Sequence, residues 1–292
     1  MSPEDIRSLG FFWSVRRRRY WQQCRRRYFL HYYLARIGRG EEADATCREV
    51  LALDRQVTAQ AFIRIIITRC MHDMFQRGEQ GELAQAAVLH LRHEINRMLT
   101  YPETVPLLVG ELFEGNIPVK ETLAYLREEV RRAGEKVDAN FWQKIQYIPM
   151  EMRRYVTLPQ RVNLMELACY FVPAVVFSIH GELWVLESSG VKEAGNLISC
   201  LHRLYALNDL GHDPVRVRSL YLDDCYELQQ LDDLTSVSAS LEEIKSDVAS
   251  MTEAEMEGFV TLHDFPPSPG PFCHSCQFRQ FCASRGTFLE KS

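Results

Sequence analysis

The sequence of 292 residues lacks several features that would assign it to a specialised class of protein. No apolar run approaches the ~20 residues that a membrane-spanning helix needs, so we expect no membrane segment. Residues 1–20 hold only a short apolar cluster, Phe11–Trp13, followed by arginines, which is not the order of a secretory signal. There is no internal repeat and no low-complexity tract. With 46% hydrophobic and 25% charged residues, the composition predicts a cytoplasmic globular protein of one large or two modest domains.

A cytosolic setting disfavours disulfides, so the nine cysteines are expected to be free thiols or metal ligands. Three of them form the motif Cys273-x2-Cys276-x5-Cys282 in a polar, Pro-flanked tail, and the two-residue spacing lets two sulfurs face one metal. Zinc and iron–sulfur cubes both take four ligands. Cys24 is the best fourth candidate because its neighbouring arginines would hold a thiolate. The other five cysteines are expected to be packing residues.

Hydrophobic patterning predicts helices first and a mixed α/β region after them. The expected helices cover residues 20–37, 57–77, 81–99, 119–134, 139–147, 193–210 and 241–251. The expected strands cover residues 168–179, 183–186 and 214–222, with His180–Gly181 as a tight turn between the first two. This order predicts an α/β fold in which a small mixed sheet is flanked by helices and interrupted by a helical insertion.

The formal net charge of −5 hides an uneven distribution. Nine arginines and no acidic residue lie between Phe11 and Gly40, whereas eleven carboxylates accompany Lys245 between Asp223 and Glu257. Guanidinium groups neutralise phosphates and aromatic rings stack on unpaired bases. The residues predicted to bind nucleic acid are therefore Arg16, Arg17, Arg18, Arg19, Arg25, Arg26, Arg27, Trp21 and Tyr28.

Two further charged segments bear on this hypothesis. Arg216 and Arg218 are expected to extend the basic face. The acidic stretch is either a solvated surface or a dock for a basic partner. The alternative for the arginine-rich segment is a solvated helix whose aromatic residues turn into the core, or a surface that binds an acidic partner.

Together these residues resemble the iron–sulfur PD-(D/E)XK nucleases, which include the AddB nuclease domain and the RecB-like CRISPR-associated nucleases. The resemblance covers most of the chain, except that residues 78–159 carry no motif. It implies a PD-(D/E)XK-like fold with a 4Fe-4S cluster that joins the two ends of the chain, held by Cys24, Cys273, Cys276 and Cys282, with zinc as the alternative. The parts implied are residues 1–77, a helical insertion at 78–159, the nuclease core at 160–258 and the cysteine segment at 259–292.

Three residues match the family's catalytic motifs. His72 stands where a helix ending in G-x-x-x-H supplies a metal-binding histidine, although Thr68 replaces the glycine. Glu187 stands at the carboxylate of the D/E-x-K motif. Tyr205 matches the tyrosine of Q-x-x-x-Y, with Leu201 in place of the glutamine.

Two essential groups of the family pattern are missing. Ala174 occupies the position of the metal-binding aspartate, and Ser189 that of the catalytic lysine. A metal that activates water for phosphodiester hydrolysis needs several well-placed carboxylates, and serine supplies no positive charge. Lys192 could replace the lysine, and Glu166 or Asp223 the carboxylate, but both substitutions would have to occur together.

The sequence therefore predicts a nuclease-like iron–sulfur protein without an intact catalytic site and without a catalytic divalent metal. We expect it to bind DNA, single- or double-stranded, and to scaffold a complex in repair, recombination, defence or mobile-element biology. One alternative is an active metal-dependent exonuclease that uses Lys192. A second alternative is an iron–sulfur redox sensor that binds DNA.

Overall fold

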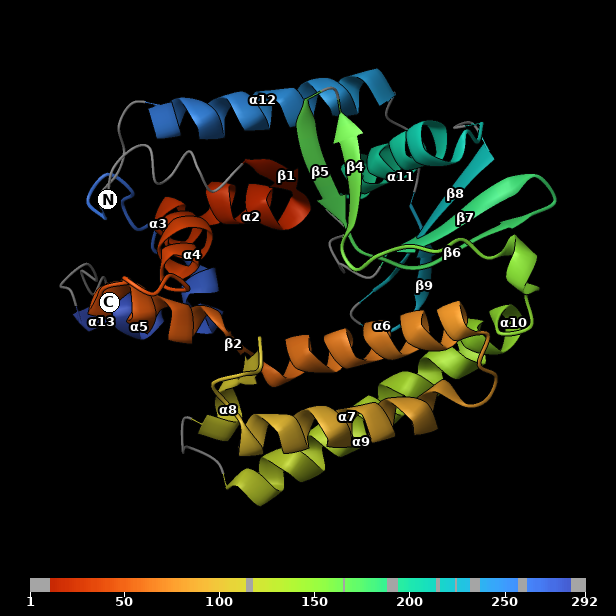
Figure 1. The fold of residues 1–292 in the computed structure, drawn as a ribbon, viewed down its shortest axis with the longest axis horizontal. Coiled ribbons are helices and arrows are strands. Elements are labelled where there is room, and N and C mark those ends of the chain that lie inside the picture. The colour runs from red at the N-terminus through yellow and green to blue at the C-terminus, as the bar shows by residue number, and fades with distance from the viewer. Residues whose placement is uncertain are drawn as a thin grey trace.

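Helices and several small β-sheets make up the fold, which confirms the expected α/β class (Figure 1). The computed structural model describes residues 11–113, 118–164, 166–187, 194–213, 216–223, 225–231, 237–256 and 262–284. Within these ranges, no helix combines the length and the apolar character needed to cross a membrane.

The N-terminal region is a series of short helices that changes direction at Cys24. Its elements are β1 (Phe12–Ser14), α2 (Val15–Gln23), α3 (Arg25–Phe29), the π-helical turn η1 (Leu30–Leu34), α4 (Ala35–Ile37) and α5 (Ala45–Asp54). The single helix expected over residues 20–37 is interrupted because the Cys24 backbone is extended, with φ −161° and ψ 108°. Its N–H still donates to the Tyr20 carbonyl at 2.9 Å, while its Sγ accepts the Arg27 N–H at 3.5 Å. Cys24 thus ends one helix and caps the next.

The middle of the chain forms a helical layer. Its elements are β2 (Gln56–Val57), α6 (Ala59–Arg77), α7 (Leu83–Thr100), β3 (Leu108–Val109), α8 (Gly110–Phe113), α9 (Val119–Val137), η2 (Asp138–Trp142), α10 (Gln143–Ile145) and η3 (Met150–Met152). As the sequence predicts, α6 ends at Gly78, whose φ of +72° suits glycine. At Gly134, α9 crosses α7 so closely that a Cβ would lie 2.4 Å from the Ala84 Cα.

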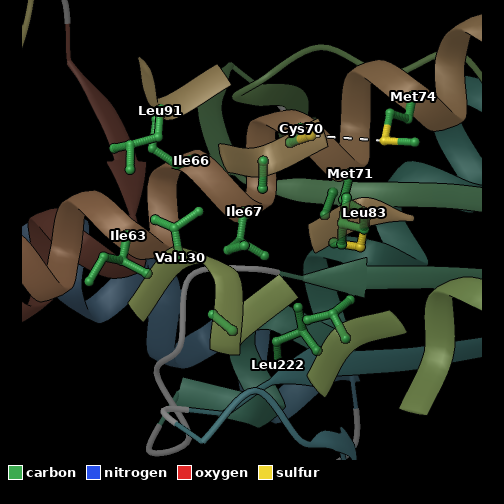
Figure 2. Packing of buried hydrophobic residues seen from close by; sticks show 14 of the residues in the cluster. Ile63, Ile66, Ile67, Cys70, Met71, Met74, Leu83, Leu91, Val130 and Leu222 are labelled. Carbon is green, nitrogen blue, oxygen red and sulfur yellow. Dashed lines mark hydrogen bonds between the residues drawn. The ribbon is translucent and has the colours of Figure 1, made fainter. Parts of the chain in front are cut away.

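Helix α6 is apolar around most of its circumference because it is covered on two sides. Figure 2 shows Ile66, Ile67 and Met71 of α6 among Leu83 and Leu91 of α7 and Val130 of α9. Its other side packs against the sheet that follows, through residues such as Leu222. The helical region predicted as an insertion therefore shares one hydrophobic core with the sheet.

The C-terminal half supplies most of the strands. Its elements are β4 (Gln160–Leu164), β5 (Leu167–Phe171), β6 (Pro173–Ile179), β7 (Glu182–Glu187), α11 (Gly195–Leu210), β8 (Val217–Leu222), β9 (Leu228–Gln230), α12 (Val237–Met256), η6 (Pro271–Ser275) and α13 (Arg279–Ser284). The single strand expected over 168–179 is two strands in different sheets: β5 pairs with β1 and β4, and β6 begins the sheet β6-β7-β8-β9. The ladder stops between them because Pro173 has no N–H and the Val172 N–H donates to the Glu187 carboxylate.

The four-stranded sheet has the predicted hairpin at one end and a helical crossover after it. His180 and Gly181, with φ of 51° and 77°, form the turn between antiparallel β6 and β7. Helix α11, which ends at Gly211, then returns the chain so that β8 runs parallel to β7. Alternate residues face opposite layers: Leu186 and Phe177 contact the α6 core, and Val185 and Leu183 contact the α11 core.

Candidate metal centre

The four cysteines predicted as ligands line one pocket. Cys24 lies between α2 and α3, Cys273 lies in η6, Cys276 follows η6, and Cys282 lies in α13. The space between these residues, counted together with the solvent at its mouth, is about 400 Å³. Its other lining residues are Arg27, Leu30, Pro267, Ser268, Pro269, Phe272, Phe278 and Arg279. The structure thus brings together residues that lie some 250 positions apart in the chain.

Apolar packing brings the C-terminal segment to the N-terminal helices. Phe278 and Phe281 are buried against Leu30, Ala35 and Val50. Helix α13 consequently lies beside α5 in Figure 1. Burying each phenylalanine side chain contributes roughly 1.5–3 kcal/mol, so the tail is docked by its own hydrophobic contacts.

Two adjacent arginines reinforce this docking. The Arg26 guanidinium donates to the carbonyls of Phe265 (3.0 Å) and Leu262 (3.1 Å). Arg27 donates to Gln277 Oε1 (3.1 Å) and to the Tyr20 hydroxyl (3.2 Å), and its guanidinium lies 4.0 Å from the centre of the Tyr20 ring. These arginines join the helix after Cys24 to the segment that carries the other three cysteines.

Backbone N–H groups point to three of the four sulfurs. Cys24 accepts from Arg27 at 3.5 Å, Cys273 accepts from Gly270 at 3.4 Å, and Cys276 accepts from Phe278. Such bonds stabilise thiolates and tune metal centres. As they stand, no three or more His, Cys, Asp or Glu side chains in the described ranges are positioned to hold a metal ion. The donor set therefore fits a four-thiolate group in number and chemistry, while the sulfurs are not in ligating positions.

Burial sets the protonation of two of these thiols. It raises the pKa of Cys282 to about 11, with Arg26 opposing the shift, and it raises the pKa of Cys276, with Arg27 opposing it. Both groups are therefore protonated at neutral pH in the metal-free protein. A metal bound by their thiolates would displace these protons, so its affinity would increase with pH.

The remaining cysteines are mostly packing residues, as expected. Cys47, Cys70, Cys169 and Cys200 are buried. Cys225 is the exception, since it is exposed in the turn between β8 and β9. The sequence offered no signal for this difference beyond the polar residues around Cys225.

The residues matched to the nuclease motifs do not converge. Glu187 lies on β7 on the α11 side, because it shares the side of Val185 and contacts His202 of α11. His72 lies on α6, on the opposite side of the sheet, with its ring against the backbone of Ala174. Burial lowers the pKa of His72, so its imidazole is neutral at pH 7. Ala174 is fully buried at a β-bulge, where no carboxylate is available.

Glu187 is buried, and its carboxylate makes hydrogen bonds to other residues of the fold. Its two oxygens accept the Val172 N–H at 3.1 Å each, and the His202 Nε2 lies 3.4 Å from its Oε2. The His202 Nδ1 is bonded in turn to the Ser219 hydroxyl at 2.9 Å. Tyr205 packs edge-on against Phe171, and burial raises its pKa to about 12. His202 and Ser219 were not singled out from the sequence; the i, i+3 spacing of His202 and Tyr205 on one helix was the available signal.

The structure gives no support to Lys192, Glu166 or Asp223 as replacements for the missing catalytic lysine and aspartate. Ser189 and Lys192 lie outside the described residues, so the displaced lysine stays a prediction. Asp223 caps its own turn, since its Oδ1 accepts the N–H groups of Cys225 and Glu227 at 2.8 Å each. Glu166 is exposed, on the loop between β4 and β5.

The predicted nucleic-acid residues divide into buried and exposed groups, which corrects the predicted set. Arg17, Arg26, Trp21 and Tyr28 are buried, so they cannot contact phosphates or stack on bases in this fold. Arg18 pairs with Glu243 and with Asp247 (3.4 Å) of α12. Arg27 faces the cysteine pocket. Arg16, Arg19 and Arg25 are exposed.

The other charged segments also find partners within the chain. Part of the acidic stretch, α12, docks on α2: Trp13 Nε1 donates to Asp247 (3.2 Å) and Trp21 Nε1 to Ser250 (3.2 Å). Arg218 pairs with Glu182 at 2.9 Å in the β6–β7 hairpin, at the end of the molecule far from α2 and α3 in Figure 1. Arg216 and Arg218 therefore do not extend the N-terminal basic face.

Arg17 illustrates why an arginine-rich segment can be structural. Its guanidinium donates to the Tyr28 hydroxyl (3.0 and 2.8 Å), the Tyr33 hydroxyl (3.1 Å) and the Phe12 carbonyl (3.2 Å). It also lies 4.0 Å from the centre of the Phe11 ring and 4.7 Å from that of Tyr32. Hydrogen bonds and aromatic faces together replace the water that this buried cation loses.

We expect Arg17→Met to lower the free energy of unfolding by about 3 kcal/mol, because it leaves buried phenol and carbonyl groups without donors. The neighbouring Arg16→Met is the matched control, and its exposed side chain should change stability by no more than about 0.5 kcal/mol. Denaturant unfolding followed by circular dichroism measures both. Equal losses from the two substitutions would contradict a structural role specific to Arg17.

Comparison of the chain with protein-family models, with curated proteins and with solved structures found no match.

Proposed function

We propose that the chain is a nuclease-like iron–sulfur protein without nuclease activity, which binds DNA and scaffolds a DNA-processing complex. The observation that carries the proposal is the gathering of Cys24, Cys273, Cys276 and Cys282 around one pocket. Spacing and local context predict this grouping from the sequence alone, although the residues come from opposite ends of the chain.

We propose a cluster and not a single zinc ion because of the resemblance to the iron–sulfur nucleases, and the pocket offers four cysteines to hold it. Four thiolates match the ligand number of a 4Fe-4S cluster. Arg26 and Arg27 lie close enough to offset the negative charge of the ligated group. When bound, the cluster supplies a covalent link between the chain ends and a one-electron centre.

The topology supports the nuclease-like part of the proposal. A helix, an antiparallel hairpin, a crossover helix and a parallel strand follow in the order α6, β6–β7, α11 and β8. Hydrophobic patterning predicts this order of a helix, two strands joined by a tight turn, a helix and a further strand. The absence of catalysis follows from chemistry: Ala174 offers no ligand, and Glu187 is held by Val172 and His202 on the face opposite His72.

Anaerobic purification followed by metal analysis, visible spectroscopy and DNA assays tests the proposal. We expect about four iron atoms per chain, broad visible absorption, salt-sensitive DNA binding and no cleavage with Mg²⁺ or Mn²⁺. One zinc per chain, or neither metal, would overturn the iron–sulfur assignment. Metal-dependent cleavage by the purified protein would replace the proposal with an active exonuclease, and reversible oxidation that changes DNA affinity would favour a redox sensor.

A further inference from the structure

Helix α2 presents a stripe of exposed polar side chains on one side only. Arg16, Arg19 and Gln22 are exposed and follow one another at intervals of three residues, so they share one face. The opposite side of α2 is in the core through Arg17 and Trp21. Arg25, at the start of α3, is also exposed. Among the arginines of α2 and α3, the exposed ones are therefore Arg16, Arg19 and Arg25.

Most aromatic rings of the same segment are not accessible. Those with less than 9% of their surface exposed are Trp13, Tyr20, Trp21, Tyr28, Phe29, Tyr32 and Tyr33. The half-buried Phe11 and Phe12 are engaged internally, where Phe11 faces the Arg17 guanidinium and Phe12 packs edge-on against Tyr170 and Tyr32. A base can stack only on a ring face that solvent can reach. Among the rings of the described residues 11–33, only those of Phe11 and Phe12 therefore keep part of their surface exposed.

The hydrogen bonds of the tyrosine hydroxyls and of the Trp21 indole N–H confirm that these rings belong to the interior. The Tyr28 and Tyr33 hydroxyls accept from Arg17, and the Tyr20 hydroxyl accepts from Arg27. The Trp21 indole donates to Ser250 of α12. Exposing these rings would break bonds that connect α2 to α3, η1 and α12.

We propose that the exposed face of α2, with Arg25, binds the sugar–phosphate backbone of nucleic acid and makes no stacking contact with bases. The inference rests on the proposed DNA-binding function and narrows it to one chemical class of contact. Each phosphate contact to a single strand adds about 0.7 to the salt dependence of binding. A stacked base would add about 1–3 kcal/mol, and the aromatic rings of α2 and α3 are all buried and cannot supply it.

The test uses full-length, metal-loaded protein and fluorescence anisotropy with three probes: oligothymidine, an abasic strand of the same length, and a duplex. We expect oligothymidine and the abasic strand to bind with affinities within about twofold of each other, since no stacking energy distinguishes them. Arg16→Gln and Arg19→Gln should each lower the salt slope by about 0.7 on single strands and about 0.9 on duplex. Arg48→Gln, which changes an exposed arginine on α5, is the matched control and should leave the slope unchanged.

The outcomes separate this inference from the function on which it rests. Oligothymidine binding at least about tenfold tighter than abasic binding would overturn the inference while leaving DNA binding intact. DNA binding unaffected by the Arg16 and Arg19 substitutions would overturn it as well. No binding to any of the three probes would remove the proposed DNA-binding function itself. Because these side chains are exposed, the variants should unfold at the temperature of the unmodified protein, which excludes misfolding as the cause of any change.

Discussion

Cys24→Ala should abolish iron binding and lower the free energy of unfolding by about 5 kcal/mol. The reason is chain entropy: a group held by Cys24 and by the tail cysteines closes a loop of some 250 residues, and a cross-link of that span restricts the unfolded chain by about this amount. Iron analysis and anaerobic denaturant unfolding measure the two effects. Removing the metal with a chelator should reproduce, in the unmodified protein, the part of this loss that comes from the cross-link.

Two further variants separate the ligand from its other roles. Cys24 also caps α3 through its Sγ, so part of the effect of alanine, about 1 kcal/mol, comes from the lost cap. Cys24→Ser restores a capping oxygen but no thiolate, so it should recover that part while still losing the iron. Cys225→Ala removes an exposed cysteine outside the pocket and should leave both iron and stability unchanged. A normal iron content in both Cys24 variants would show that Cys24 is not a ligand.

The C-terminal cysteine segment is also docked by contacts other than the cluster, so the loss of stability on iron removal can be interpreted. Phe278 and Phe281 are buried against the N-terminal helices, and Arg26 holds the backbone at Phe265, without any metal. The tail should therefore remain attached in the metal-free protein. The stability lost with the iron then reports the cross-link itself and not the release of a whole segment.

Local signals in the sequence predicted several helix ends and one turn because each of these is fixed by a few neighbouring residues. Gly78 and Gly211 end helices through positive φ, and His180–Gly181 makes a two-residue turn for the same reason. The three tail cysteines stood out because cysteines that serve only as packing residues belong in apolar elements and not in a polar, Pro-flanked segment, and Cys24 stood out because of the arginines beside it. In each of these cases the information lies within a few residues.

Side-chain direction was not predictable in the same way, because its causes lie far along the chain. The burial of Arg17 depends on the hydroxyls of Tyr28 and Tyr33, and the segment would look identical if those rings faced solvent. The partner of Arg18 is Glu243, more than two hundred residues away. The basic run was predicted to bind nucleic acid, and the acidic run to be a solvated surface or a dock for a basic partner, whereas the fold pairs part of each run with the other.

Glu187 is the position where the structural and catalytic hypotheses predict opposite results. If Glu187 held a catalytic metal, Glu187→Ala would remove cleavage with little loss of stability. In this structure it accepts the Val172 N–H at the break between β5 and β6 and contacts the buried His202. We therefore expect Glu187→Ala to lower the free energy of unfolding by about 4 kcal/mol, since it leaves a buried N–H and a buried imidazole without their acceptor.

Substitutions that preserve the shape of the side chain can test why Glu187→Ala lowers stability. Glu187→Gln retains an oxygen for Val172 and should recover part of the stability, while the contact with His202 is weakened. Combined with His202→Gln in a double-mutant cycle, it should show a coupling energy of about 1 kcal/mol or more between the two side chains. Glu182→Ala is the control, because Glu182 lies on the same strand but makes a surface pair with Arg218, and it should change stability little. A cycle with no coupling, or an alanine variant as stable as the control, would contradict the structural role and make Glu187 a catalytic candidate again.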